Sequence, residues 1–116
     1  MDALERLTRI AEDLPEAQVT RHERHARLTV RDRTFAWLTD DHHGDGILGV
    51  TVKAAPEEGE MLLDAAPDRY YRPQYLGARG WIALRLDTET VDWDEVADRL
   101  IGSYRLVAPK RLVAQL

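Results

Sequence analysis

Apolar residues recur at helical spacing in some stretches of the chain and at alternate positions in others. Near the N-terminus, a single apolar stripe runs through Asp2–Leu14, and this spacing predicts an amphipathic helix. Asp2 and Glu5 have the spacing of an N-terminal cap with a returning carboxylate, and Pro15 is expected to end the helix.

Two further helices are predicted in the second half of the chain. The first begins at Pro56, is expected to bury Met61, and ends before Pro67. The second, Asp92–Val107, has an aspartate cap and a continuous apolar stripe. A glycine inside a helix costs about 1 kcal/mol relative to alanine. Gly102 is therefore expected to permit a close approach by a neighbouring element.

Alternation of apolar and polar positions predicts strands in the remaining stretches. The predicted strands are a first one around Leu28–Val30, then Thr34–Thr39, Ile47–Lys53 and Trp81–Leu86. The first two are expected to form a hairpin, with Phe35 and Trp37 on one side of the second strand. Short strands with hairpin connections favour an antiparallel sheet that carries its helices mainly on one face. The predicted fold is an α+β two-layer sandwich.

Composition agrees with one globular domain spanning residues 1–116. The chain is 44% hydrophobic and 32% charged, and it contains no cysteine, so disulfides and thiolate metal sites are excluded. No apolar run approaches the ~20 residues of a membrane span. The acidic N-terminus does not resemble a signal peptide. We therefore expect a cytoplasmic protein with no membrane partner and no cofactor.

Chemistry-bearing residues do not predict an enzyme or a metal centre. Ser103 is the only serine, and neither elbow glycines nor a nearby histidine accompanies it. His22 and His25 precede a strand, where a three-residue spacing does not suit a metal. His42 and His43 lie in an acidic, glycine-bracketed loop that is typical of a solvated turn. We expect no metal site and no catalytic residue.

The polar face of the predicted sheet is informative despite a formal net charge of −5. If the aliphatic positions face the helices, the other face carries basic side chains and an exposed aromatic ring. Its expected members are Arg27, Thr29, Arg31, Thr51, Lys53, Trp81 and Arg85. Such a face can stack bases and follow phosphates. Alternatively, arginine stems cover a solvated sheet and Trp81 packs beneath them.

The chain also resembles the MmcQ/YjbR family. The residues that carry the resemblance are RDRTFAWL, the VKA of Val52–Ala54, YRPQYLGARGWIALRLD, VDWDEVADRL and SYRLVAPKRL. The resemblance implies a fold like that of the frataxin-type CyaY proteins, with a surface likened to a double-wing DNA-binding arrangement. It also implies DNA as the partner. Many members have lysine where Arg33 and Arg79 stand here, and arginine keeps the positive charge.

The leading hypothesis is a non-enzymatic DNA-binding protein that uses a basic and aromatic sheet face. Its expected phosphate contacts are Arg27, Arg31, Arg33, Lys53, Arg72, Arg79 and Arg85. Tyr75 and Trp81 are the expected stacking residues. A second hypothesis is a protein-interaction or small-ligand-binding adaptor without a nucleic-acid role, which would use the acidic helix faces and the tyrosine loop of Tyr70, Tyr71 and Tyr75. A third is iron binding by analogy with frataxin, for which Asp92, Asp94, Glu95 and Asp98 are the carboxylate candidates.

Overall fold

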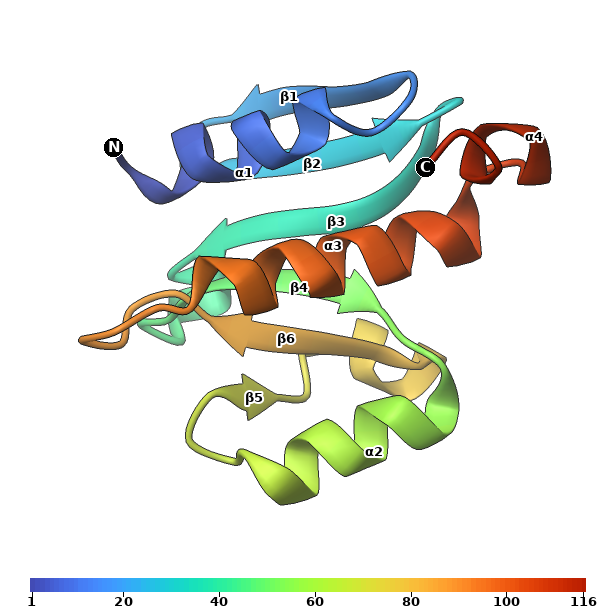
Figure 1. Ribbon diagram of the computed structural model, residues 1–116. Helices are drawn as coiled ribbons and strands as arrows, with labels where there is room; N and C mark the ends of the chain where they lie inside the picture. The colour runs from blue at the N-terminus through green and yellow to red at the C-terminus, as the bar shows by residue number, and fades with distance from the viewer.

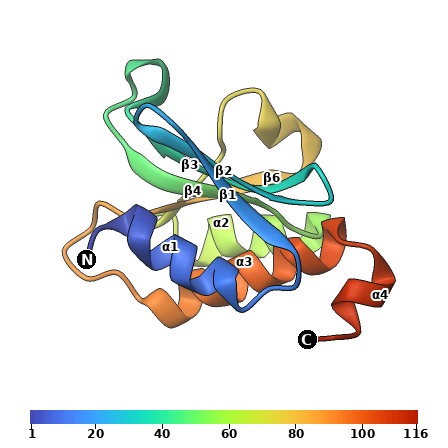
Figure 2. The ribbon, with the colours of Figure 1, turned by 90° about the horizontal axis from the view of Figure 1, so that it is seen from above.

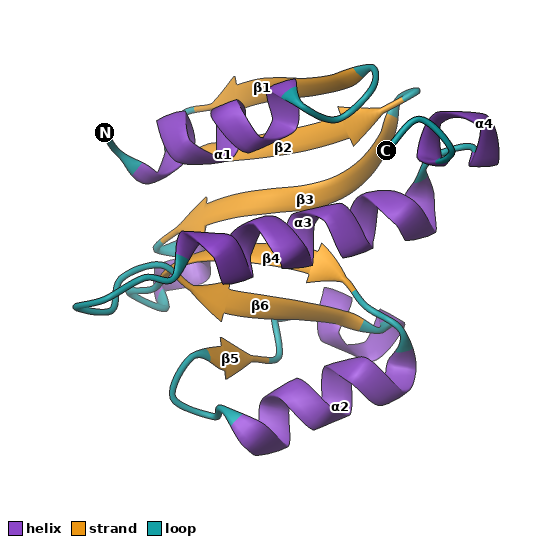
Figure 3. Ribbon diagram, in the orientation of Figure 1, coloured by secondary structure: helices purple, strands orange, loops and turns teal.

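A computed structural model describes residues 1–116 as a sheet with a layer of helices on one face (Figure 1). The helices are α1 (Ala3–Glu12), α2 (Pro56–Ala65), α3 (Trp93–Val107) and α4 (Lys110–Val113), with short 3-10 turns η1 (His42–Gly44) and η2 (Leu76–Arg79). The strands are β1 (Ala17–His22), β2 (His25–Val30), β3 (Arg33–Asp40), β4 (Leu48–Lys53), β5 (Tyr70–Tyr71) and β6 (Trp81–Arg85). Figure 3 separates these elements by colour.

The six strands form one antiparallel sheet in the order β1-β2-β3-β4-β6-β5. The predicted α+β two-layer fold is confirmed, but both edge strands are absent from the sequence prediction. β1 has too few apolar positions, because its outward residues and its free edge face solvent. β5 contains only two residues and exists because Tyr70 and Tyr71 pair with Leu84 and Ala83 of β6.

Helices α1 and α3 cover the same face of the sheet (Figure 2). Leu7 of α1, Leu28 and Val52 of the sheet, and Leu100 of α3 are almost completely buried between the layers. Asp2 caps α1 by accepting the Glu5 N–H at 2.8 Å, as predicted. Burial of this continuous apolar layer is the main stabilising contribution in a domain of this size.

The cap of α3 also agrees with the sequence. The Asp92 carboxylate accepts the backbone N–H groups of Asp94 and Glu95 at 3.0 and 3.3 Å. The expected burial of Met61 is wrong, since this side chain is 67% exposed and α2 buries no residue completely. Gly102 was predicted to admit a close neighbour, but a Cβ added there would meet no atom within 4 Å.

A β-bulge in β3 overturns the predicted facing of Phe35 and Trp37. The pairing of β2 with β3 shifts between Leu28 and Thr29, so Phe35 is the extra residue. Its ring meets Tyr104 of α3 edge-on at 5.5 Å, whereas Trp37 lies on the opposite face. A bulge reverses the alternation of side chains beyond it. The core side of β3 therefore holds Phe35, and the outer side holds Trp37.

Candidate functional site

The sheet face without helices carries most of the residues predicted for it. Strand register places Lys53 beside Trp81, and Thr51 between Trp37 and Ala83. Arg27 lies beside Trp37 on the same face, with its guanidinium carbon 5.8 Å from the indole centroid. The exception is Arg31, which lies in the β2–β3 turn with a φ of 51° instead of within a strand.

Three of the seven predicted cations form ion pairs with carboxylates. Arg31 binds Glu16 through two hydrogen bonds of 2.6 and 2.9 Å. Arg72 binds Glu60 at 2.6 Å. Arg85 binds both oxygens of Asp87 at 2.9 and 3.0 Å. These pairs raise the pKa of Arg31 and Arg85, and their positive charge is locally neutralised.

The other four cations form no ion pair, and they gather toward one end of the sheet. These four, called here the basic rim, are Arg27, Arg33, Lys53 and Arg79. β3 begins where β4 ends and β6 begins, because neighbouring strands are antiparallel. Arg33, Lys53 and Arg79 are exposed there, and Arg27 reaches toward the same end by donating to Thr34 Oγ1 at 2.5 Å. Half-buried Trp81 pairs with Lys53 and follows Arg79 by two residues.

The middle of this face is not open, because the segment after β5 folds over it. Thr51 and Ala83 are 3% and 0% exposed although neither faces the helices. Between this segment and strands β3 and β4 lies a pocket of about 480 Å³. Its lining is His25, Trp37, Thr39, His42, Asp45, Ile47, Thr51, Tyr71, Arg72, Pro73, Gln74, Tyr75 and Leu76. Volume and lining are those of a small-molecule site.

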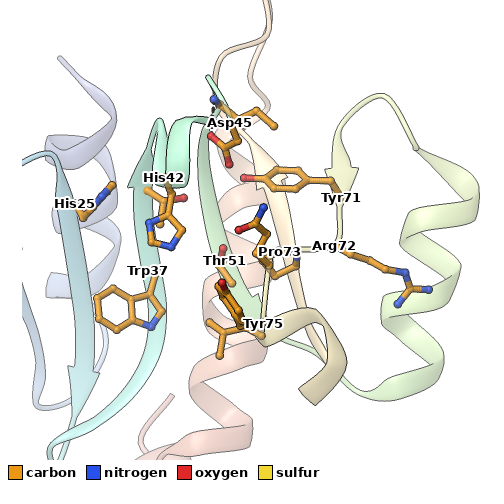
Figure 4. A pocket seen from close by; sticks show the side chains of 13 residues that line it. His25, Trp37, His42, Asp45, Thr51, Tyr71, Arg72, Pro73 and Tyr75 are labelled. Atoms are coloured by element: carbon orange, nitrogen blue, oxygen red, sulfur yellow. Dashed lines mark hydrogen bonds between the residues drawn. The ribbon is translucent and has the colours of Figure 1, made fainter.

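Figure 4 shows how the labelled side chains surround this pocket. His42 points toward Trp37, and the Tyr71 hydroxyl points across the space between the two walls. Arg72 points the other way, toward α2, so only the base of its side chain borders the pocket. The pocket therefore receives no guanidinium group from its own lining.

A chain of aromatic contacts runs from one side of the pocket to the other. His25 and His42 meet edge-on at 5.3 Å, His42 and His43 lie 3.9 Å apart, and His43 meets Tyr75 edge-on at 5.8 Å. Burial lowers the pKa of His42, and the neighbouring His43 and His25 lower it further. The neutral ring of His42 is thus the form that this arrangement favours.

Tyr75 is held in a strained backbone conformation at the mouth of the pocket. Its φ and ψ are 65° and −54°, and the Leu76 N–H donates to the Gln74 carbonyl at 2.7 Å. This geometry is the rare γ-turn with positive φ. Such strain costs of the order of 1–3 kcal/mol and is concentrated at functional sites. The turn leaves the Tyr75 side chain 78% exposed.

Tyr71 forms the opposite wall and is tightly packed. A Cβ added at Gly49 would lie 2.4 Å from the Tyr71 hydroxyl, so glycine is needed for this close approach. Burial raises the pKa of Tyr71, with Asp45 adding to the effect and a hydrogen bond from Thr39 opposing it. Tyr71 therefore presents a neutral hydroxyl to the pocket.

Two of the four acidic residues considered for iron have structural roles. Asp92 caps α3, and Glu95 accepts hydrogen bonds from Arg69 and Tyr70 at 3.0 and 2.8 Å. No group of three or more histidine, aspartate or glutamate side chains is placed to hold a metal ion. Ser103 is also structural, since its buried hydroxyl donates to the Phe35 carbonyl at 2.6 Å and accepts the Lys53 N–H at 2.9 Å.

The sequence reasoning missed most of the pocket. Trp37 was noted only for its side of the strand, and Thr39, Tyr71 and His42 were not assigned a joint role. The available signal was the alternation that places Trp37 opposite Ala36 and Leu38, together with the Tyr-Tyr-Arg-Pro-Gln-Tyr run.

No helix of the structure has the length and apolar character needed to cross a bilayer.

Two solved protein structures have folds similar to that of this chain. The crystal structure of Deinococcus radiodurans protein DR2400, which contains a DUF419 domain, is 27% identical, with a TM-score of 0.74. That match covers 91% of this chain and 78% of the other. A Pseudomonas syringae protein is similar in fold alone, at 15% identity and a TM-score of 0.67, covering 91% and 98% of the two chains.

No curated protein matches the chain. The model of one family, described as YjbR, matches residues 12–106. That range includes all six strands, the basic rim and the pocket. The family resemblance seen in the sequence motifs is therefore confirmed, and the chain belongs to the YjbR family.

Proposed function

We propose that this protein is a non-enzymatic nucleic-acid-binding protein whose main partner is DNA. It holds a single-stranded or unpaired segment on the sheet face that carries no helices. The observation that carries the proposal is the basic rim. Arg27, Arg33, Lys53 and Arg79 lack carboxylate partners, whereas the other predicted cations are paired. A local positive field acts at short range even when the net charge is negative.

The roles of the predicted residues follow from their pairing. The basic rim contacts phosphates, and Trp81 beside it stacks a base. Arg31, Arg72 and Arg85 are assigned to ion pairs within the protein, since each is held by Glu16, Glu60 or Asp87. Sheet faces that combine cations with aromatic rings bind single strands because bases stack while phosphates are neutralised. The only serine is buried and engaged in two hydrogen bonds, so it is not available as a nucleophile.

The test is a fluorescence-anisotropy titration of a labelled single-stranded oligonucleotide at several salt concentrations. Single-strand binding has a log–log salt slope of about −0.7 per phosphate contact, so four contacts give roughly −3. A variant combining Arg33→Gln, Lys53→Gln and Arg79→Gln should retain a slope of only about −0.7. All three side chains are exposed, so the variant is expected to fold.

A matched control removes the same number of positive charges from the helix layer. It combines Arg9→Gln, Arg105→Gln and Lys110→Gln, which are exposed and form no ion pair. The control should retain the wild-type slope, because its charges lie on the other side of the sheet. Equal losses in the two variants would show an effect of net charge alone and would overturn the proposed interface. Absence of a micromolar complex at low salt would overturn the function.

The pocket favours a second candidate function, a small-ligand-binding adaptor without a nucleic-acid role. The observation that supports this second function is the cavity of about 480 Å³ with a mainly uncharged lining. Under this function, planar small molecules bind to the protein, and substitutions in the basic rim do not weaken their binding. The same anisotropy experiment separates the two candidates, since an adaptor of this kind does not bind the oligonucleotide.

A further inference from the structure

The pocket has the electrostatic character expected for a neutral ligand group. Its only lining carboxylate is Asp45, and the guanidinium of Arg72 is turned away toward Glu60. Burial and the neighbouring His43 and His25 lower the pKa of His42, so its neutral form is favoured. A phosphate or another anion placed inside would meet no cation, and burying an unpaired charge is costly. An uncharged ring is the group that this lining accepts.

Aromatic side chains supply the contact surface for such a ring. Trp37 and Tyr71 come from the sheet, and Tyr75 comes from the covering segment. Tyr75 is the most exposed large apolar side chain of the protein, and a strained turn holds it at the mouth. Neither the strained turn at Tyr75 nor the exposure of its ring stabilises the folded chain. Both are understandable if the ring of Tyr75 is positioned to contact a ligand.

Neutral hydrogen-bonding groups complete the lining. The hydroxyls of Thr39, Thr51 and Tyr71 and the amide of Gln74 border the same space. Hydroxyls and amides both donate and accept, so they match the mixed edge of a heteroaromatic ring better than a hydrocarbon. A volume of about 480 Å³ lies within the range of roughly 300–1,000 Å³ for small-ligand pockets.

A cation of the basic rim lies close to Trp37 of this aromatic wall. The Arg27 guanidinium carbon lies 5.8 Å from the Trp37 ring centroid, yet Arg27 does not line the pocket. Trp37 therefore separates a cavity that no guanidinium group enters from an unpaired positive charge. A nucleotide has the same division, because a neutral planar base is joined to an anionic phosphate.

We propose that the pocket receives one unpaired nucleobase of the bound strand, with Trp37 and Tyr75 contacting the ring and Arg27 contacting the attached backbone. This inference rests on the proposed function and adds a base-binding site to it. Stacking of a base on aromatic side chains contributes about 1–3 kcal/mol. Removing that contribution weakens binding by about 5- to 150-fold.

The experiment compares two single strands of equal length and charge. One is an oligothymidine, and the other has an abasic site at every position. Because the phosphates are the same, the basic rim binds both strands, whereas only the first can fill the pocket and stack a base on Trp81. Wild-type protein should bind the abasic strand at least about 5-fold more weakly.

Two exposed truncations assign that difference to the pocket. Tyr75→Ala should weaken binding of the thymidine strand toward the abasic level and leave abasic binding unchanged. Met61→Ala is the matched control, since Met61 is 67% exposed on α2 and outside the pocket. It should change neither affinity. Equal affinities of wild-type protein for the two strands, or equal effects of the two variants, would overturn the base pocket while leaving nucleic-acid binding in place.

A second experiment tests the base-binding site if the protein binds no nucleic-acid strand. If neither strand binds, free thymidine and adenosine are titrated while the indole N–H resonance of Trp37 is followed by NMR. A shift that is lost in Tyr75→Ala would support the base-binding site in a protein that does not bind strands. Absence of any shift would overturn both the base pocket and the proposed function.

Discussion

The close approach of Tyr71 to Gly49 gives a quantitative test of how the pocket wall is built. Substitution Gly49→Ala adds a Cβ that would lie 2.4 Å from the Tyr71 hydroxyl and 3.2 Å from the Leu84 carbonyl oxygen. Comfortable contacts are about 3.5 Å or longer, so the phenol ring must move by roughly 1 Å. Overpacking of this kind costs about 1–3 kcal/mol.

An opposing contribution must be subtracted from that penalty. Gly49 has no positive φ, and alanine at such a position stabilises a protein by about 0.4–1 kcal/mol through the unfolded state. The expected net loss is therefore about 1–2 kcal/mol. For a domain of this length, each kcal/mol lowers the Tm by roughly 3–6 °C. Urea unfolding followed by circular dichroism measures the loss.

The second background in the test is Tyr71→Phe, which removes the clashing oxygen. In this background the nearest atoms to the new Cβ are the Leu84 oxygen at 3.2 Å and the ring carbon at 3.3 Å, which small shifts can accommodate. Gly49→Ala should then change the free energy of unfolding by less than about 0.5 kcal/mol, giving a coupling of about 1–2 kcal/mol. The same loss in both backgrounds would refute the close approach.

Three other outcomes are expected from single substitutions. Gly102→Ala should stabilise the protein by roughly 0.5–1 kcal/mol in urea unfolding, since the added Cβ meets no atom; destabilisation would contradict the open space. Ser103→Ala should cost about 1–3 kcal/mol, because it leaves the Lys53 N–H and the Phe35 carbonyl without this partner. Thr8→Ala, which removes only a bond to Leu4 within α1, is its control and should cost far less. Finally, the lowered pKa of His42 means that the unfolded chain binds its proton more readily. The free energy of unfolding should therefore fall as the pH drops below about 6.5, and His42→Gln should flatten that part of the pH profile. An unchanged profile would contradict the neutral His42.

One part of the sheet carries a charge of opposite sign to the net charge of the whole chain. Net charge is −5, yet four cations remain unpaired around one part of the sheet. Whether a cation is available depends on its neighbours in space: Arg72 is twelve residues from Glu60, and Arg31 is fifteen residues from Glu16. The seven predicted cations looked equivalent in the sequence and are not equivalent in the fold.

Local patterns in the sequence were sufficient for the three longer helices, the four inner strands and the two-layer arrangement. Capping by Asp2 and Asp92 depends on residues three positions away, and alternation in β4 depends on residues two positions away. Such short-range rules can be read without a structure. They failed for β5, which has two residues and no pattern of its own, and for Phe35, where a single extra residue changed the facing of β3.

Only the tertiary structure decided the pocket and the division of the cations. The pocket wall joins β3, the loop at His42 and β4, which follow one another in the chain, to the segment from Tyr71 to Leu76, which lies beyond α2. The bulge that directs Trp37 outward is held by Ser103, sixty-eight residues from Phe35. Periodicity reports which face of an element is buried, but not which elements meet. Contacts between distant segments arise when the whole chain packs, and the candidate site consists of such contacts.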